Sequence, residues 1–151
     1  MVGHNSAEHD GLGLGAYVEV FRSAVRTNKI LIITKHLGLT EREAAVFWPL
    51  YRKYEQAWAQ LIDHDLLLLK QYLDASGRLT NQAADEMSRQ HFRNRGARLA
   101  LQQEYYENIS HALSPLIAMK FEQIERQINL VMELELASRV PIVAPAERTL
   151  P

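Results

Sequence analysis

The sequence of 151 residues contains no cysteine. This absence excludes disulfide bonds, thiol nucleophiles and zinc sites built on cysteine. Glycine and proline are also scarce, with 7 and 5 residues, which argues against an all-β fold rich in turns. Because 17 basic and 18 acidic residues nearly cancel, the formal net charge of -1 indicates no overall attraction to nucleic acid.

Long hydrophobic runs are missing as well. The longest apolar cluster covers residues 30–33 and ends at Thr34, whereas a membrane-spanning helix needs about 20 apolar residues. We therefore expect no membrane span. The first fifteen residues lack the basic, apolar and small-residue order of a signal peptide. The alternatives are a cytoplasmic chain, or an export signal removed before this chain was defined.

Helical periodicity is the dominant pattern in the chain. Hydrophobic residues make up 47% of the sequence and recur at spacings of three and four. We expect four helices, which cover about residues 16–37, 41–72, 81–111 and 115–140. Short turns between successive helices favour antiparallel pairs. The predicted fold is therefore all-α, an elongated four-helix antiparallel hairpin.

The helices form the middle of three predicted segments. Residues 1–15 are Gly-rich, polar and aperiodic, which is typical of a flexible arm. Residues 16–140 form the single helical domain. Pro141 ends the last helix, and residues 141–151 contain two more prolines, so we expect an extended tail.

Two Leu-Thr pairs, forty residues apart, mark predicted helix starts. After Leu39, Thr40 is a suitable N-cap, because its hydroxyl can accept a hydrogen bond from a first-turn N–H. Glu43 follows three residues later and completes a capping box. After Leu79-Thr80 the equivalent position is Ala83, so the second box is only half present.

Aromatic residues concentrate in the second predicted helix. Four of them have helical spacing and are predicted to face the core: Phe47, Tyr51, Tyr54 and Trp58. Trp48 lies about 100° away from that face, where it either caps the edge of the hairpin or enters a dimer contact. Pro49 lies inside the helix and should kink it.

Apolar stripes are also predicted on the third and fourth helices. In the third, heptad spacing relates Phe92, Leu99, Tyr106 and Leu113. In the fourth, three-four spacing relates Ile117, Phe121, Ile124, Ile128, Val131 and Leu134. Four consecutive leucines, residues 66–69, point all round the second helix. At least one of them should meet a partner surface, so we predict a homodimer.

A basic cluster in the third helix is the candidate binding site. It contains four arginines within ten residues and no acid: Arg89, Arg93, Arg95 and Arg98. One interpretation is a basic face that, with Trp48, binds acidic or unfolded protein clients. The other is a solvated helix surface, because the four side chains wrap around the helix. Nucleic acid is not the expected target, since nothing else in the chain is strongly basic.

Metal binding and catalysis have little support in the sequence. The six histidines include the group Asp63-His64-Asp65, but adjacent helical residues diverge by about 100° and do not face one ion. His4, Glu8, His9 and Asp10 form at best a chelating arm. No phosphate-binding loop, zinc-protease motif or nucleophile elbow occurs. We therefore predict a protein that is not an enzyme and that has no metal site and no cofactor.

Part of the sequence resembles the Spy/CpxP family of periplasmic helical proteins. The most specific piece is Phe47-Trp48-Pro49-Leu50-Tyr51, and the similar order covers roughly residues 26–143. The family signature, Leu-Thr-x-x-Gln, occurs twice in its members. Here both Leu-Thr starts are present, but Glu43 and Ala83 replace the glutamines.

The resemblance implies a periplasmic location and an elongated helical hairpin, often a dimer with a concave face. Members of the family act as chaperones that need no ATP, as modulators of envelope-stress signalling or as metal-responsive sensors. The expected function is therefore binding of an unfolded or signalling protein, with a chaperone-like or stress-sensing role. The alternatives are a metal-responsive sensor and a dimeric helical scaffold without chaperone activity.

Overall fold

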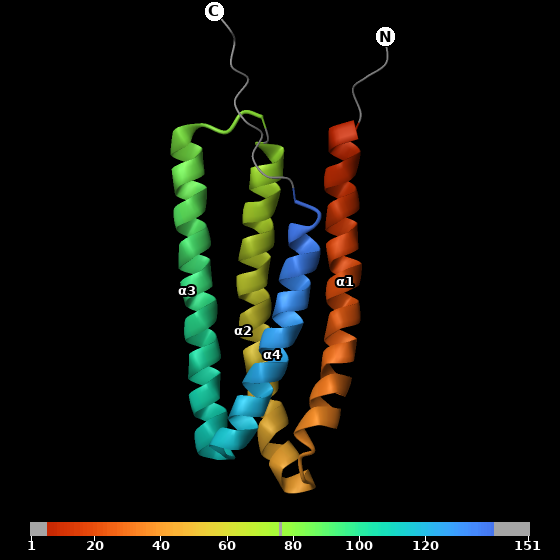
Figure 1. Cartoon of the computed structure of the whole chain (residues 1–151), viewed down its shortest axis with the longest axis vertical. Coiled ribbons are helices and arrows are strands. Elements are labelled where there is room, and N and C mark those ends of the chain that lie inside the picture. The colour runs from red at the N-terminus through yellow and green to blue at the C-terminus, as the bar shows by residue number, and fades with distance from the viewer. Residues whose placement is uncertain (1–5, 76, 141–151) are drawn as a thin grey trace, which may run out of the picture.

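The computed structural model describes residues 6–75 and 77–140, and the side chains of α1 mainly from Arg22 onward. In these residues it has four helices and no strand (Figure 1). The helices are α1 (Ser6–Leu37), α2 (Glu41–Asp74), α3 (Asn81–Ala112) and α4 (Pro115–Ala137). The prediction of an all-α fold is confirmed.

Successive helices run in opposite directions along a long bundle. The α1–α2 and α3–α4 turns lie at one end, and the α2–α3 turn lies at the other (Figure 1). α2 packs on α3, α3 packs on α4, and α4 packs on α1, so the first and last helices lie side by side. With 23 residues α4 is shorter than α2 and α3, and it ends before the α2–α3 turn.

The predicted helix starts are confirmed. The Glu43 N–H donates to the Thr40 hydroxyl at 3.2 Å, and the Thr40 N–H donates to the Glu43 carboxylate at 3.0 Å. Thr80 accepts from the Ala83 N–H at 3.1 Å, without a reciprocal bond. Ser114 caps α4, which begins with proline. These caps satisfy first-turn N–H groups that have no partner within the helix.

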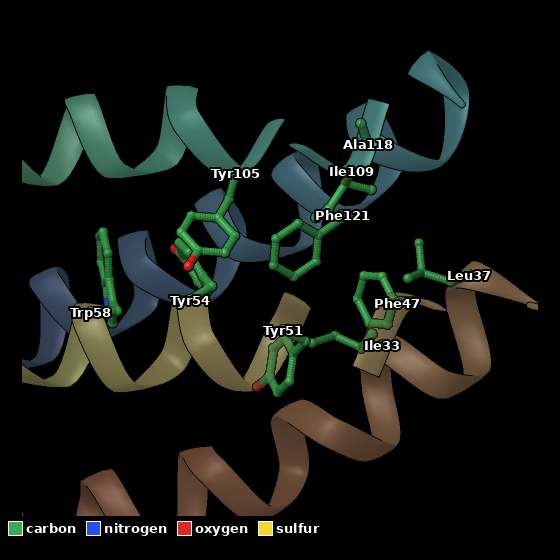
Figure 2. Packing of buried hydrophobic residues seen from close by; sticks show 10 residues of the cluster. All are labelled: Ile33, Leu37, Phe47, Tyr51, Tyr54, Trp58, Tyr105, Ile109, Ala118 and Phe121. Atoms are coloured by element: carbon green, nitrogen blue, oxygen red, sulfur yellow. The ribbon is translucent and has the colours of Figure 1, made fainter. Parts of the chain in front are cut away.

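The core is built on the aromatic face of α2, as predicted. Phe47, Tyr51, Tyr54 and Trp58 are all buried. Figure 2 shows how they meet buried residues of the other helices, namely Ile33, Leu37, Tyr105, Ile109, Ala118 and Phe121. The ring of Phe121 lies edge-on to those of Phe47, Tyr51 and Tyr54, at centroid distances of 5.4 to 6.0 Å. Edge-to-face packing of this kind is the geometry that aromatic pairs favour.

The stripes predicted for α3 and α4 are partly wrong. Phe92 and Leu99 are 70% and 65% exposed, and Val131 and Leu134 are 58% and 72% exposed. The core side of α3 instead holds Asn94, Tyr105 and Ile109, and that of α4 holds Ala118, Phe121 and Glu125. Hydrophobic periodicity misplaced these faces because polar residues occupy core positions in both helices.

The start of α1 differs from the expectation, and Pro49 lies inside α2 as predicted. α1 begins at Ser6 and not at Ala16, so helical backbone reaches into the segment predicted to be a flexible arm. Extending an existing helix costs far less free energy than nucleating a new one. This difference explains how α1 continues through Gly-rich residues. α2 continues without a break across Pro49, which is exposed. The predicted tail, 141–151, and residues 1–5 lie outside the described residues.

The two threonine caps allow a test of the helix starts. Thr40→Ala should lower the free energy of unfolding by about 1 kcal/mol, because it removes the centre of a complete capping box. Thr80→Ala should cost the same or less, since only one bond is lost. Chemical denaturation of both variants measures the difference. A clearly larger loss for Thr80→Ala would contradict this account of the caps.

Candidate functional site

A buried ion cluster joins three helices near the middle of the bundle. Lys29 of α1 is 4% exposed and lies between Glu55 of α2 and Glu125 of α4. Its ammonium nitrogen is 2.8 Å from Glu125 Oε1 and also donates a hydrogen bond to Glu55. Glu125 is 2% exposed, and its other oxygen accepts a 2.9 Å hydrogen bond from the Tyr54 hydroxyl. The cluster therefore ties α1, α2 and α4 together.

Burial dominates the electrostatics of this cluster. The pKa of Glu125 is raised above its ordinary value of 4.5, because loss of water disfavours the carboxylate more than Lys29 and Tyr54 favour it. Burial and the nearby Glu125 raise the pKa of Tyr54 as well, so its hydroxyl keeps its proton and stays a donor. The Lys29 ammonium also lies 5.6 Å from the centroid of the Tyr54 ring, within range of a cation–π interaction.

The void directly beside the cluster is small. The adjoining void, between α1, α2 and α4, has a volume of about 50 Å³ and is lined by Arg22, Lys29 and Glu55 among others. A water molecule needs about 10–15 Å³ of such space, so the void has room for only a few waters. We interpret the cluster as the attachment of α1 to the bundle.

A second polar layer joins α2, α3 and α4. Asn94 is buried in α3 and donates to Asp65 at 3.1 Å. Arg98 lies 3.3 Å from Asp65 and 3.7 Å from Glu133, with its guanidinium 5.9 Å from the centre of the Trp58 ring. The Arg98 side chain is only 14% exposed. Arg98 was predicted to bind clients. Here it links three helices, and it also lines the open groove described below.

The other three predicted arginines are exposed on α3. Arg89 forms an ion pair with Asp85 one turn away, at 2.9 Å. Arg93 and Arg95 form no ion pair within the described residues. Trp48 is half-buried, and its ring lies edge-on to Phe47 and Tyr51 at 5.1 and 5.3 Å. The structure therefore does not bring Trp48 to the arginines.

An open groove lies between α3 and α4, with α2 as its floor. It has a volume of about 590 Å³ and lies toward the end of the bundle where α4 stops short. Its apolar and aromatic lining consists of Trp58, Ile62, Leu66, Leu68, Leu69, Tyr72, Met87, Phe92, Met132 and Leu136. Arg95 and His91 also line the groove. Asp65, Arg98 and Glu133 line it as well, and Arg98 pairs with both carboxylates. We call this hollow the α2–α3–α4 groove. It combines an apolar floor with Arg95, which has no acidic partner in the described chain.

The acidic group around His64 is divided between different partners. Asp63 accepts from Arg22 at 2.8 Å, and Asp65 accepts from Asn94. In the described part of the chain no three His, Cys, Asp or Glu residues are grouped as metal ligands. His4 lies outside the described residues, and the side chains of Glu8, His9 and Asp10 are not described.

Comparison with protein-family models, curated proteins and solved structures finds no match to this chain. Among the described helices, none is long and apolar enough to cross a membrane.

Sequence reasoning missed the buried cluster altogether. Glu125 follows Phe121 by four residues and Ala118 by seven, so it lies on the core face of α4. Lys29 precedes Ile33 by four residues on the core face of α1. The sequence did contain a signal for the cluster: Lys29 and Glu125 have opposite charges, and each is spaced like a core residue of its helix. Charged residues are buried only when they are paired, so the two could have been predicted to meet.

The attachment role of Lys29 predicts a pH-dependent loss of stability in Lys29→Met. Removing the ammonium leaves the buried Glu125 and the half-buried Glu55 without their cation, which should cost about 3 kcal/mol at neutral pH. Without Lys29 the pKa of Glu125 rises further, and the folded state then holds a proton that the unfolded state has already released. The stability of the variant should therefore fall as pH rises above about 4.5, and the loss should be smaller at pH 5 than at pH 8.

Glu125→Gln is the matched control for this experiment. It keeps an acceptor for Tyr54 and removes the buried charge, so it should restore much of the stability of Lys29→Met at pH 8 when the two changes are combined. Urea denaturation of the parent and the three variants at both pH values measures these effects. Equal losses for Lys29→Met at pH 5 and pH 8 would contradict the electrostatic account.

Proposed function

We propose that this protein acts by reversible binding of other polypeptides and that the α2–α3–α4 groove is the binding surface. One observation carries the proposal: Phe92 and Arg95 line the same groove as the apolar side chains of its floor. The Phe92 side chain is 70% exposed, so it is accessible to a partner. An exposed aromatic ring beside a hydrophobic groove is a common anchor of protein interfaces. The volume of about 590 Å³ falls within the range of ordinary binding sites.

The chemistry of the groove indicates the class of partner. Its floor, with Ile62, Leu66 and Leu69, suits apolar side chains. Arg95 adds a positive charge that has no acidic partner within the described chain, and it therefore favours a carboxylate on the ligand. The proposed ligand is an apolar segment of an unfolded or signalling protein flanked by acidic residues.

The cellular role rests on the resemblance to the Spy/CpxP family. The Phe47–Tyr51 segment and the two capped Leu-Thr starts support a periplasmic protein with a chaperone-like or stress-sensing role that needs no ATP. The up-and-down arrangement of four helices is compatible with the family's helical hairpins. We also propose that the chain forms a homodimer, because apolar side chains on several helices are exposed.

The arginines of α3 provide a matched test of groove binding. Arg95→Gln should weaken capture of a denatured acidic client by about two- to fivefold, because an exposed charge contributes up to about 1 kcal/mol. Arg93→Gln removes the same charge from the same helix but away from the groove, and should have little effect. Suppression of client aggregation without ATP, measured at low and high salt, gives the comparison.

The apolar part of the groove is tested with a second matched pair. Phe92→Ala should reduce client capture by about tenfold, as expected for an aromatic anchor. Leu99→Ala truncates another exposed apolar side chain of α3 that does not line the groove, and should leave capture unchanged. Equal effects of Phe92→Ala and Leu99→Ala, with equal effects of the two arginine variants, would exclude the groove as the binding surface.

A further inference from the structure

The outer face of α4 carries large apolar side chains, and no other helix among the described residues covers it. Its large exposed side chains are Leu116, Met119, Leu130, Val131 and Leu134, each between 50% and 72% exposed. Leu116, Leu130 and Leu134 lie across the helix from the buried Phe121. Val131 lies on the flank toward α1, where it lines an open hollow of about 700 Å³ between α1 and α4. In Figure 1 α4 lies in front of α2, and no other described helix lies in front of α4. A helix that is apolar on both sides is normally buried in an assembly.

The order of residues along this face is self-complementary. When two antiparallel helices are related by a two-fold axis, residues equally distant from the axis meet. With the axis level with Glu125, Leu116 of one copy meets Leu134 of the other, each nine residues away. Met119 and Val131 lie at the same level, each six residues away. Apolar side chains therefore meet apolar side chains at both ends of the contact.

The centre of the same face also matches itself. Gln123 meets Gln127, each two residues from the axis, and a glutamine amide both donates and accepts hydrogen bonds. Moving the axis by two residues in either direction would place Met119 or Val131 against a glutamine. Lys120 meets Leu130 in the matching register, and its long chain can cover the leucine while the ammonium stays in water.

The exposed surface of the chain leaves room for such a contact. The chain exposes 11315 Å², a total that includes the ends outside the described residues. A folded monomer of 17.3 kDa is expected to expose about 7,800 Å². The difference is larger than the area that one chain of an obligate dimer buries, about 1,000–2,500 Å². An elongated bundle accounts for part of it, and the apolar face of α4 is the part that a partner would cover.

We infer that the outer face of α4 is the interface between two copies of this chain, with the two α4 helices antiparallel about an axis level with Glu125. This inference names the surface of the homodimer proposed above and therefore rests on it. It does not depend on the α2–α3–α4 groove, because α4 contributes Met132 and Leu136 to that groove from its other side. Both surfaces are therefore available at the same time.

Disulfide trapping tests the direction and the register of the two helices, because the chain has no native cysteine. Leu116→Cys and Leu134→Cys are made in separate chains. In the antiparallel pair, Cys at 116 in one copy is adjacent to Cys at 134 in the other. Two copies of residue 116 are about 27 Å apart, since eighteen residues separate the levels at a rise of 1.5 Å each. The mixture should therefore form disulfide-linked dimers under mild oxidation, and neither variant alone should do so.

The possible outcomes separate the alternatives. Cross-linking of Leu116→Cys with itself would show parallel helices and overturn the inference. The absence of a cross-link in all three samples would overturn it as well. The fold of each variant is checked by circular dichroism, which should be unchanged because both side chains are exposed in the single chain.

The oligomeric state provides the second measurement. The parent should have twice the mass of 17.3 kDa in light scattering at 100 µM. The double variant Leu130→Gln/Leu134→Gln should dissociate at least tenfold more readily. Leu67→Gln/Leu99→Gln is the control, since it alters two equally exposed leucines on other helices. A parent that is monomeric, or a loss of dimer in the control alone, would contradict the α4 interface. Client capture retained by the monomeric variant would leave groove binding intact.

Discussion

The bundle depends on one buried ionic contact, that of Lys29 with Glu55 and Glu125. In the described part of α1, only Ile33 and Leu37 add buried apolar side chains to the core, and both lie near the α1–α2 turn. Farther from that turn, α1 is held through Lys29 and through Arg22, which pairs with Asp63. Because a buried ammonium needs its carboxylates, these pairs fix the register of α1 against α2 and α4.

A similar constraint acts between the other helices. α3 buries few apolar side chains, and Asn94 and Arg98 connect it to Asp65 of α2. Polar contacts of this kind add little net stability compared with a well-packed apolar core, but they disfavour other arrangements in which their partners are lost. Because few apolar side chains are buried between these helices, hydrophobic side chains such as Phe92 and Leu134 remain on the surface.

These exposed side chains place the two proposed binding surfaces on opposite sides of α4. One side of α4 joins Phe92 and Arg95 in the α2–α3–α4 groove, and the other carries the apolar row from Leu116 to Leu134. A dimer formed through the second surface would present two copies of the first. Such an arrangement would allow one polypeptide to be bound at two places, which raises the effective affinity without new contacts in either groove.

The sequence by itself determined that the chain is helical, where α2, α3 and α4 begin, and which face of α2 is buried. Thr40, Thr80 and Ser114 act locally, because each hydroxyl binds an N–H three residues ahead. The buried face of α2 was equally clear, because its aromatic residues are spaced three and four apart and therefore lie on one side of the helix. Only the tertiary structure decided which faces of α1, α3 and α4 are buried and where Arg98 lies. A charged or amide side chain enters a core when a partner from another helix meets it, and helical spacing within one segment carries no information about that partner.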